Sequence, residues 1–483
     1  MSVALDHDTF RLDHDHETFR NELASVAPDG RRRWIYARQP SGRFYRARTI
    51  LSWFLLVFLF AAPFVRVGGL PLILLNVIDR KFVLFGMFFW PQDFYQVVLI
   101  ALAGLVTLAI STATVGRIWC GWLCPQTVFM EMLFRKIEYL IEGSAAQQLR
   151  RNRGPWTGDR LWRQGGKLAI FFALSFAIAN TFLAYIIGAD ALWTIVTDPP
   201  RQHAAGLAAI TIFSVVFFLV FARFREQACT LACPYGRVMS AITNRHTITV
   251  TYDIGRGEPR ARLQRGAVAS ARPAGDCVDC HQCVTVCPTG IDIRNGIQME
   301  CVNCAACVDA CDDVMTRVGR PKGLIRLTSH DAVTGGRSYG LTASVKAYAA
   351  VWLVLVTVVA TVLVRRAPLD VVVLRQPGTL YATLPGGGAA NFYNVQVFNR
   401  SRTPEAYEIV VTSPAGVSVT PLAVAARVGA HDLVEGRLLV SMPASALLGG
   451  GQPLTFELRA GGRVIERLES SFIGPPAGVR GAL

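Results

Sequence analysis

Two neighbouring cysteine-rich stretches decide the fold of the middle of the chain. The first reads Cys277-Val-Asp-Cys280-His-Gln-Cys283-Val-Thr-Val-Cys287-Pro288, and the second reads Cys301-Val-Asn-Cys304-Ala-Ala-Cys307-Val-Asp-Ala-Cys311. Both have the spacing C-x2-C-x2-C-x3-C of bacterial ferredoxins, in which three thiolates surround one iron–sulfur cluster and the fourth points to the neighbouring cluster. The two stretches therefore predict a bacterial-type 2[4Fe–4S] ferredoxin domain at about residues 270–320.

The crossed spacing assigns four thiolates to each predicted cluster. One cluster would be held by Cys277, Cys280, Cys283 and Cys311, and the other by Cys301, Cys304, Cys307 and Cys287. Two zinc sites are disfavoured, because four-cysteine zinc sites usually show two C-x2-C pairs separated by a longer loop. Asp312 stands where a proline is expected after the eighth cysteine. That proline is not a ligand, so we expect an altered local turn with the cluster retained.

The other four cysteines form two matching C-x3-C-P motifs, called the CxxxCP motifs below. They read Cys120-Gly-Trp-Leu-Cys124-Pro125 and Cys229-Thr-Leu-Ala-Cys233-Pro234. Proline suits the first position of a helix, so Cys124 and Cys233 are predicted N-cap residues beside a positive helix end that favours the thiolate. Four thiolates suit Cu(I), zinc or a further iron–sulfur cluster.

Other side chains near these motifs are assigned no ligand role. Met130, Met132 and Met239 follow the CxxxCP motifs, and core packing is favoured for them over thioether ligation of copper. His281 lies within the first cluster loop. It is interpreted as a neighbour that tunes the cluster, not as a ligand.

The composition favours a membrane protein. Of 483 residues, 52% are hydrophobic and only 17% are charged, which excludes a disordered chain and argues against an ordinary soluble enzyme. Five apolar stretches reach the roughly 17 to 25 residues that a membrane-spanning helix needs. These predicted spans of an α-helical bundle are 49–65, 94–115, 168–188, 204–222 and 347–364. The first follows a long polar stretch without a small-residue cleavage site, so a span is expected there and not a signal peptide.

The basic residues predict the orientation of these spans. Lys and Arg gather before the first span and between the second and third, whereas the opposite loops hold only Arg66, Arg80, Lys81 and Arg201. Basic residues near span ends stay in the cytoplasm. The N-terminus and all twelve cysteines are therefore expected inside, and the C-terminus outside. The net charge of +15 is explained by these loops, so no nucleic-acid partner is expected.

The remaining segments complete the predicted domain plan. Residues 1–48 form a cytoplasmic tail with a rough His/Asp-rich repeat at 5–11 and 12–20, which is interpreted as solvated rather than metal-binding. Two apolar pieces, 70–77 and 82–90, are too short to cross a membrane. We expect them to pack against the bundle; a re-entrant or interfacial hairpin is the alternative. The transmembrane bundle occupies 49–222, and 223–346 is the cytoplasmic region.

The composition changes after the last span, at 365–483, to short alternating runs separated by Pro and Gly. The seven runs are 370–374, 380–384, 392–398, 407–411, 438–442, 454–458 and 464–468. They predict a periplasmic all-β sandwich of immunoglobulin type, which contains no cysteine and so no disulfide. An interaction or assembly role is favoured for it over a catalytic one.

With these features together, the chain resembles the cytochrome c oxidase accessory proteins of the CcoG, FixG and RdxA family. The paired CxxxCP motifs, each after a predicted span, carry the resemblance together with the C-terminal β-domain. Three further segments contribute: Trp90-Pro91-Gln92-Asp93-Phe94, Cys287-Pro-Thr-Gly-Ile-Asp-Ile-Arg-Asn-Gly296 and Gly323-Leu-Ile-Arg326. Nearly the whole chain is covered, except the tail before Arg31.

This resemblance implies a multi-pass iron–sulfur oxidoreductase of the bacterial inner membrane that reduces Cu(II) to Cu(I). The copper would serve the assembly of a cbb(3)-type oxidase, with oxidase subunits and copper chaperones or transporters as partners. The ferredoxin cysteines would relay electrons, and the catalytic, copper-handling residues would be Cys120, Cys124, Cys229 and Cys233. The sequence identifies neither the electron donor nor whether the protein forms a homodimer.

Two other functions remain open. A membrane quinol dehydrogenase of NapH type would use the same clusters to pass electrons to a partner, with the CxxxCP cysteines supporting the relay. A non-enzymatic scaffold would bind copper and dock its outer β-domain on oxidase subunits. A turnover assay separates the scaffold from the reductase.

Overall fold

The computed structural model describes residues 24–27, 29–78, 81–262, 275–335, 341–422 and 424–476. The His/Asp-rich repeat lies outside these residues. The chain divides into two compact units. The first comprises Met1–Val65 and Val98–Thr357, and the second comprises Arg66–Val97 and Val358–Leu483.

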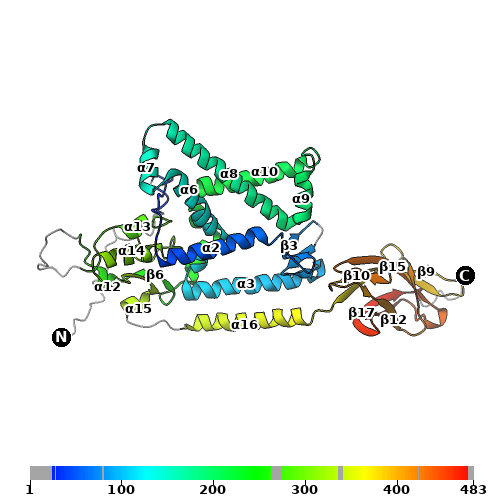
Figure 1. The fold of residues 1–483 in the computed structure, drawn as a ribbon. Coiled ribbons are helices and arrows are strands. Elements are labelled where there is room, and N and C mark those ends of the chain that lie inside the picture. Colours follow the sequence, from blue (N-terminus) through cyan, green and yellow to red (C-terminus); the bar gives the residue numbers. More distant parts are fainter. Residues whose placement is uncertain are drawn as a thin grey trace. The chain divides into compact units, whose positions relative to one another are not determined.

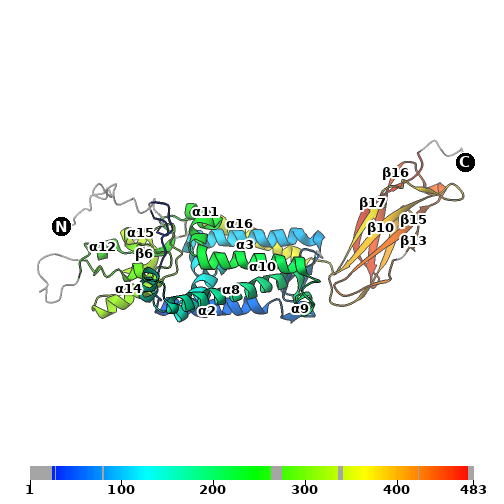
Figure 2. The ribbon, with the colours of Figure 1, turned by 90° about the horizontal axis from the view of Figure 1, so that it is seen from above.

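Five helices in the described residues are long and apolar enough to cross a membrane. They are α2 (Arg43–Ala61), α3 (Phe94–Val115), α8 (Gly158–Ile187), α10 (Ala204–Leu219) and α16 (Ala343–Val364). The predicted five-helix bundle is confirmed, and within it α8 packs against α10 and contacts α2 (Figures 1 and 2). Helices α2 and α8 begin several residues before the predicted spans. Hydropathy detects only the apolar part of a helix, and polar first turns continue it beyond that part.

Aromatic packing holds the bundle together near its cysteine-bearing end. The ring of Phe134 stacks on Phe221 at 4.6 Å and meets the edge of Phe171 at 4.8 Å between centroids. Phe134 and Phe221 are almost fully buried, and Met130 lies in the same cluster. Met132 is also buried. The structure therefore places both Met130 and Met132 in the packed core. The side chain of Met239 is outside the description.

The ferredoxin region is framed by one antiparallel strand pair and two helices. Strand β6 (Ile248–Tyr252) pairs with β7 (Ile325–Ser329). Helices α13 (Gln282–Thr285) and α14 (Ala306–Arg317) carry the third cysteine of each loop. The apolar core between these elements includes Val250 and Leu324, each about 1% exposed. This core fixes both cysteine loops on a common frame.

The second unit contains the predicted β-sandwich. One sheet has the order β13-β15-β10-β8, with β9 on β10, and the other has the order β12-β16-β17. The strands are β8 (Leu369–Arg375), β9 (Ala382–Thr383), β10 (Ala389–Asn399), β12 (Glu408–Ser413), β13 (Ser418–Leu422), β15 (Leu433–Met442), β16 (Gly451–Ala460) and β17 (Arg463–Ile473). All seven predicted runs correspond to strands. Strand β13 was not predicted, because its short sequence contains Pro421 and reads as an edge or loop.

The short apolar pieces form a small antiparallel sheet that lies in the second unit and packs on the β-domain. The sheet consists of β3 (Ile73–Asn76), β4 (Lys81–Leu84) and β5 (Met87–Phe89). Its buried face joins Phe88 and Trp90 to Phe398 of strand β10. The Trp90 and Phe398 rings are 5.1 Å apart. The loop therefore packs on strand β10 in an apolar cluster of its own, separate from the sandwich core.

A buried ion-pair cluster ties the same loop to the β-domain. Asp93 is 1% exposed, and its carboxylate accepts hydrogen bonds from Arg366 and Arg400, each at 2.6 Å. Arg400 also donates to Asp370 at 2.5 Å. A carboxylate removed from water needs such partners. The Trp90-Pro-Gln-Asp93 segment is thus an internal joint of the second unit.

Replacing Asp93 with alanine should loosen this unit strongly, since two buried guanidinium groups lose their common counter-charge. Breaking one side of a buried ion pair typically costs about 3–5 kcal/mol. Hydrogen exchange of the β8 and β10 amides in the full-length protein should accelerate accordingly. Glu435→Gln, at an exposed carboxylate of β15, is the matched control and should change exchange little. Unchanged protection in Asp93→Ala would show that the cluster does not hold the unit together.

The β-domain should also lose stability as pH rises toward neutrality. Burial, and next the neighbouring Asp370, raise the pKa of Glu466 to about 7. A raised folded-state pKa stabilises the fold fully below the unfolded value, about 4.3, and this stabilisation disappears as pH rises through about 7. Opening free energies from hydrogen exchange, corrected for intrinsic rates, should fall over this pH range.

Glu466→Gln should flatten this pH dependence. Glu469→Gln, at an exposed residue of the same strand, is the control and should leave it unchanged. Identical pH profiles in both variants would contradict the assignment of the pH dependence to Glu466.

Candidate metal centres

The first thiol group surrounds a small cavity within the ferredoxin core. Its cysteines are Cys277, Cys280, Cys283 and Cys311, and the wall includes Tyr252, Arg294 and Leu324. Cys280 is exposed, whereas the other three thiols are buried. This group therefore has one ligand position that reaches the protein surface.

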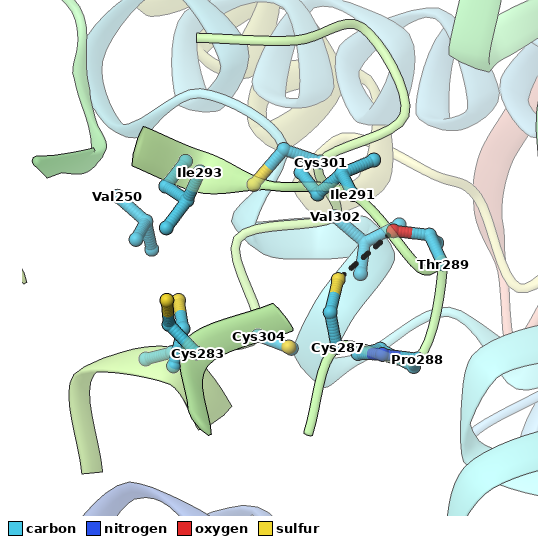
Figure 3. Close-up of a pocket in the computed structure, with 12 residues that line it drawn as sticks. Val250, Cys283, Cys287, Pro288, Thr289, Ile291, Ile293, Cys301, Val302 and Cys304 are labelled. Atoms are coloured by element: carbon cyan, nitrogen blue, oxygen red, sulfur yellow. Dashed lines mark hydrogen bonds between the residues drawn. The ribbon is translucent and has the colours of Figure 1, made fainter. Parts of the chain in front are cut away.

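The second thiol group surrounds a neighbouring cavity. Its cysteines are Cys287, Cys301, Cys304 and Cys307, with Cys283 at the border with the first cavity. Figure 3 shows Cys287, Cys301 and Cys304 around a common space, with Thr289 Oγ1 3.4 Å from Cys287 Sγ. The two sets are those that the crossed spacing assigns to two clusters. Four thiols around a mainly apolar cavity have the donor chemistry of a [4Fe–4S] site.

The backbone of the two loops explains how three thiols reach one cavity. Asp279 and His281 have positive φ values of 49° and 55°, and Asn303 and Ala305, at the matching positions of the second loop, have 53° and 59°. Non-glycine residues seldom adopt this conformation, although Asp and Asn adopt it more readily than most. The repeated left-handed residues bend each loop around its cavity.

Burial makes these thiols poor acids until a metal replaces the proton. It raises the pKa of Cys283, Cys301 and Cys311 to about 12. Metal ligation requires the thiolate, so a bound cluster supplies the positive charge that compensates deprotonation. These cysteines are therefore expected to lose their protons when iron binds.

A charged network supports the outer side of the first group. Arg294 forms 2.6 Å ion pairs with Asp292 and Asp279, and its Nη2 lies 2.9 Å from His281 Nδ1. The ring nitrogen Nδ1 of His281 thus faces a guanidinium and not the thiols. Arg294 was not predicted from sequence, because its partners Asp279 and His281 belong to the preceding cysteine loop.

The CxxxCP motifs begin helices as the prolines predict. Cys124 is the N-cap of α5 (Pro125–Thr127), and Cys233 directly precedes α11 (Pro234–Ile242). Both cysteines have extended backbone conformations, with ψ values of 125° and 114°. The prolines therefore occupy first helical positions, where a missing N–H costs no hydrogen bond.

The structure brings the two CxxxCP motifs together within one chain. Burial raises the pKa of Cys229 to about 12, and the next causes are the neighbouring thiols of Cys124, Cys120 and Cys233. The pKa of Cys120 is likewise raised, first by burial. In the described part of the chain, no three His, Cys, Asp or Glu side chains are grouped as ligands of one metal ion. We refer to these four cysteines as the membrane-face thiols.

The first CxxxCP motif packs directly on the second ferredoxin loop. Cys120 belongs to a buried cluster with Val302 and Cys304. A side chain at Gly121 would collide with the Val302 carbonyl oxygen, so glycine permits this close approach. Trp122 Nε1 donates to the carbonyl oxygen of Asn303 at 3.2 Å. The membrane-face thiols and the second thiol group are therefore neighbours across one packed interface.

The end of a membrane-spanning helix forms part of this interface. Asn303 Nδ2 donates to the carbonyl oxygen of Val115, the last residue of α3, at 3.2 Å. The Val250 amide donates to Asn303 Oδ1 at 3.2 Å. The last carbonyl groups of a helix lack intrahelical hydrogen-bond donors. Here Asn303 of the cluster loop supplies the donor for the Val115 carbonyl. Asn303 was not predicted from sequence, because only its position between two ligand cysteines distinguishes it.

The turn into the second CxxxCP motif is fixed by a buried ion pair. Arg225 has a φ of 53° and donates from both Nη1 and Nη2 to the Glu138 carboxylate at 2.9 Å. Both side chains are at most 4% exposed. Arg225, with the other cations around it, lowers the pKa of Glu138 to about 2 although burial alone would raise it. Cys229 lies four positions after Arg225, so this pair positions the second motif.

Comparisons with known protein families agree with this architecture. A 4Fe-4S dicluster domain matches residues 224–330, and a 4Fe-4S binding domain matches residues 97–142. The Ig-like fold found at the C-terminus of FixG matches residues 359–475. The predicted ferredoxin-type region and C-terminal Ig-like domain are confirmed. The 97–142 match includes Cys120 and Cys124.

Named relatives cover most of the chain. Protein RdxA of Cereibacter sphaeroides is 36% identical over 79% of this chain and 83% of its own length. Protein RdxB of the same organism is 35% identical over 80% and 83%. The nitrogen fixation protein FixG of Rhizobium meliloti is 37% identical over 61% of this chain and 57% of its own. With its two thiol-lined cavities, five apolar helices and Ig-like domain, the chain belongs to the FixG/RdxA family of iron–sulfur membrane proteins.

Proposed function

We propose that the protein reduces Cu(II) to Cu(I) at the membrane-face thiols, using electrons from two [4Fe–4S] clusters. The observation that carries the proposal is the packing of Cys120 against Val302 and Cys304 of the second ferredoxin loop. It gives electrons a short route from a cluster ligand to four soft ligands. Thiolates favour Cu(I) over Cu(II) because the reduced ion is softer.

The ligand assignment follows the two cavities. Cys277, Cys280, Cys283 and Cys311 would hold the first cluster, and Cys287, Cys301, Cys304 and Cys307 the second. When bound, each cluster supplies a one-electron carrier. One electron converts one Cu(II) into one Cu(I), so no proton or further oxidant is needed. The exposed Cys280 favours electron uptake at the first site, and the buried Cys120 favours delivery beside the second.

The copper would serve assembly of a cbb(3)-type oxidase in the bacterial inner membrane. In the proposed orientation the N-terminus and all thiols are cytoplasmic and the β-domain is periplasmic, where it would dock oxidase subunits or copper chaperones. The basic loops before α2 and between α3 and α8 support this orientation.

A second candidate is an electron relay with a further cluster. The match of residues 97–142 to a 4Fe-4S binding domain favours it, since Cys120 and Cys124 supply two thiols and Cys229 and Cys233 would supply the rest. Iron content separates the candidates: about eight iron atoms per chain fit two clusters, and about twelve fit three.

The crossed ligand assignment predicts which single replacements share an effect. Cys277→Ser and Cys311→Ser should lose the same cluster, because their thiols line one cavity despite their distance in sequence. Cys287→Ser and Cys304→Ser should lose the other. Each should remove roughly four of eight iron atoms, and the cluster EPR signal that remains should be the same within each pair. If Cys287→Ser instead lost the same cluster as Cys277→Ser, as grouping by sequence order predicts, the crossed assignment would be contradicted.

Copper reduction is tested anaerobically with the purified, cluster-loaded protein. After reduction and removal of excess reductant, substoichiometric Cu(II) is added, and its EPR signal is followed with a Cu(I) chelator and the cluster spectrum. We expect Cu(I) to appear as the clusters oxidise, and Cys124→Ala and Cys233→Ala, once shown to keep two clusters, to lose most of this activity. Ser144→Ala, at a helix cap remote in sequence from both motifs, should retain it.

Two outcomes would reject the copper proposal. Clusters that stay reduced while Cu(II) persists would favour the relay or the scaffold. Cu(I) formed without cluster oxidation would mean that thiol oxidation, and not the clusters, supplies the electrons.

A further inference from the structure

Arg117 lies where the two CxxxCP motifs and the second ferredoxin loop meet. It directly precedes α4 (Ile118–Trp122), which carries Cys120, and it is only 7% exposed. Its Nη1 donates to the carbonyl oxygen of Met299, two residues before Cys301. A Cβ added at Gly236, just after the second motif, would lie 2.9 Å from Arg117 Nη2. One guanidinium thus contacts all three segments.

The guanidinium lies beside ligand segments of both neighbouring sites. Arg117 is three positions before Cys120, and the carbonyl oxygen that accepts from its Nη1 is two positions before Cys301. A Cβ at Gly236 would lie 2.9 Å from Arg117 Nη2 and 2.8 Å from the carbonyl oxygen of Cys229. The cation is therefore placed next to the membrane-face thiols and next to a ligand of the second cavity.

Arg117 lacks an ordinary counter-ion. Among the residues that the structure describes, no carboxylate forms an ion pair with it, although Glu300 is near enough to feel its charge. Its buried Nε has no hydrogen-bond partner. An uncompensated buried charge is costly, and the negative charge near Arg117 comes from Glu300, from thiolate ligands and from an added electron.

We propose that Arg117 is a positioning residue that clamps the CxxxCP motifs to the second ferredoxin loop and stabilises the electron held there. Positive charge and hydrogen bonds near a cluster's sulfur ligands favour its reduced state and raise its potential. The role rests on the proposed electron route from the second cluster to the membrane-face thiols. It does not depend on the final acceptor being copper.

The test is a redox titration of the full-length, cluster-loaded protein, followed by EPR in the absence of copper. In Arg117→Gln we expect the potential of the second cluster to shift to more negative values while that of the first stays near wild type. Arg117→Lys keeps the charge but loses the planar fork, so its shift should have the same sign and be smaller. The clusters are identified beforehand by Cys277→Ser and Cys304→Ser.

Arg48→Gln is the matched control. Arg48 is 3% exposed and donates Nε to the carbonyl oxygen of Gly121 in the same motif at 2.9 Å, on the backbone rather than at a thiol. It should leave both potentials near wild type. If Arg117→Gln fails to load its clusters, Arg117→Lys decides alone: a shift confined to the second cluster supports the proposal.

Three results overturn it: loaded variants with unchanged potentials, equal shifts of both clusters, or the same shift in Arg48→Gln. Failure of copper reduction is distinguishable, because the titration contains no copper. A protein that does not reduce Cu(II) but shows the selective shift retains the role of Arg117 in electron transfer.

Discussion

The arrangement depends on one close packing contact, the seating of Cys120-Gly121 on the second ferredoxin loop. Glycine allows the backbone of this motif to approach Val302, and Trp122 Nε1 donates to the carbonyl oxygen of Asn303 at 3.2 Å. Asn303 then joins the loop to the last carbonyl of α3. A membrane-spanning helix, a thiol motif and a cluster loop are therefore fixed by one small set of contacts. Displacement of this loop would move the membrane-face thiols away from the second cavity.

Buried charge fixes the second motif in a different way. The Arg225–Glu138 pair has both side chains at most 4% exposed, and Lys167 lies 3.4 Å from the same carboxylate. Buried ion pairs add little net stability, but they are costly to break and restrict the chain to one geometry. That restriction suits a turn that must deliver Cys229 and Cys233 to thiols from a distant segment. The same reasoning applies to Asp93, whose two arginines fix the loop that carries β3–β5 within the second unit.

The sequence predicted the parts whose determinants are local. Ferredoxin ligand spacing is a property of a short loop, and apolar spans and alternating strands are visible in windows of 5 to 25 residues. Residues such as Arg117, Arg225 and Asp93 escaped prediction, because their roles come from partners 87 to 307 positions away. The partner of the β3–β5 sheet was missed for the same reason. The apolar pattern of the sheet showed that it packs, but its partner, Phe398, is supplied by a remote strand.

Burial of the thiols constrains how the two kinds of site can work together. Both Cys229 and Cys301 have a pKa raised to about 12 by burial, so each becomes a thiolate only when a cation compensates it. In the ferredoxin cavities the iron of a cluster would supply that charge, permanently. At the membrane-face thiols an incoming metal ion would do so transiently, with Arg117 as the fixed cation in between. If the proposed copper reduction holds, such a site would bind the ion most tightly after one electron has made it softer. Reduction and retention of the ion would then reinforce each other, and release would require a partner that offers thiolate or thioether ligands of comparable strength.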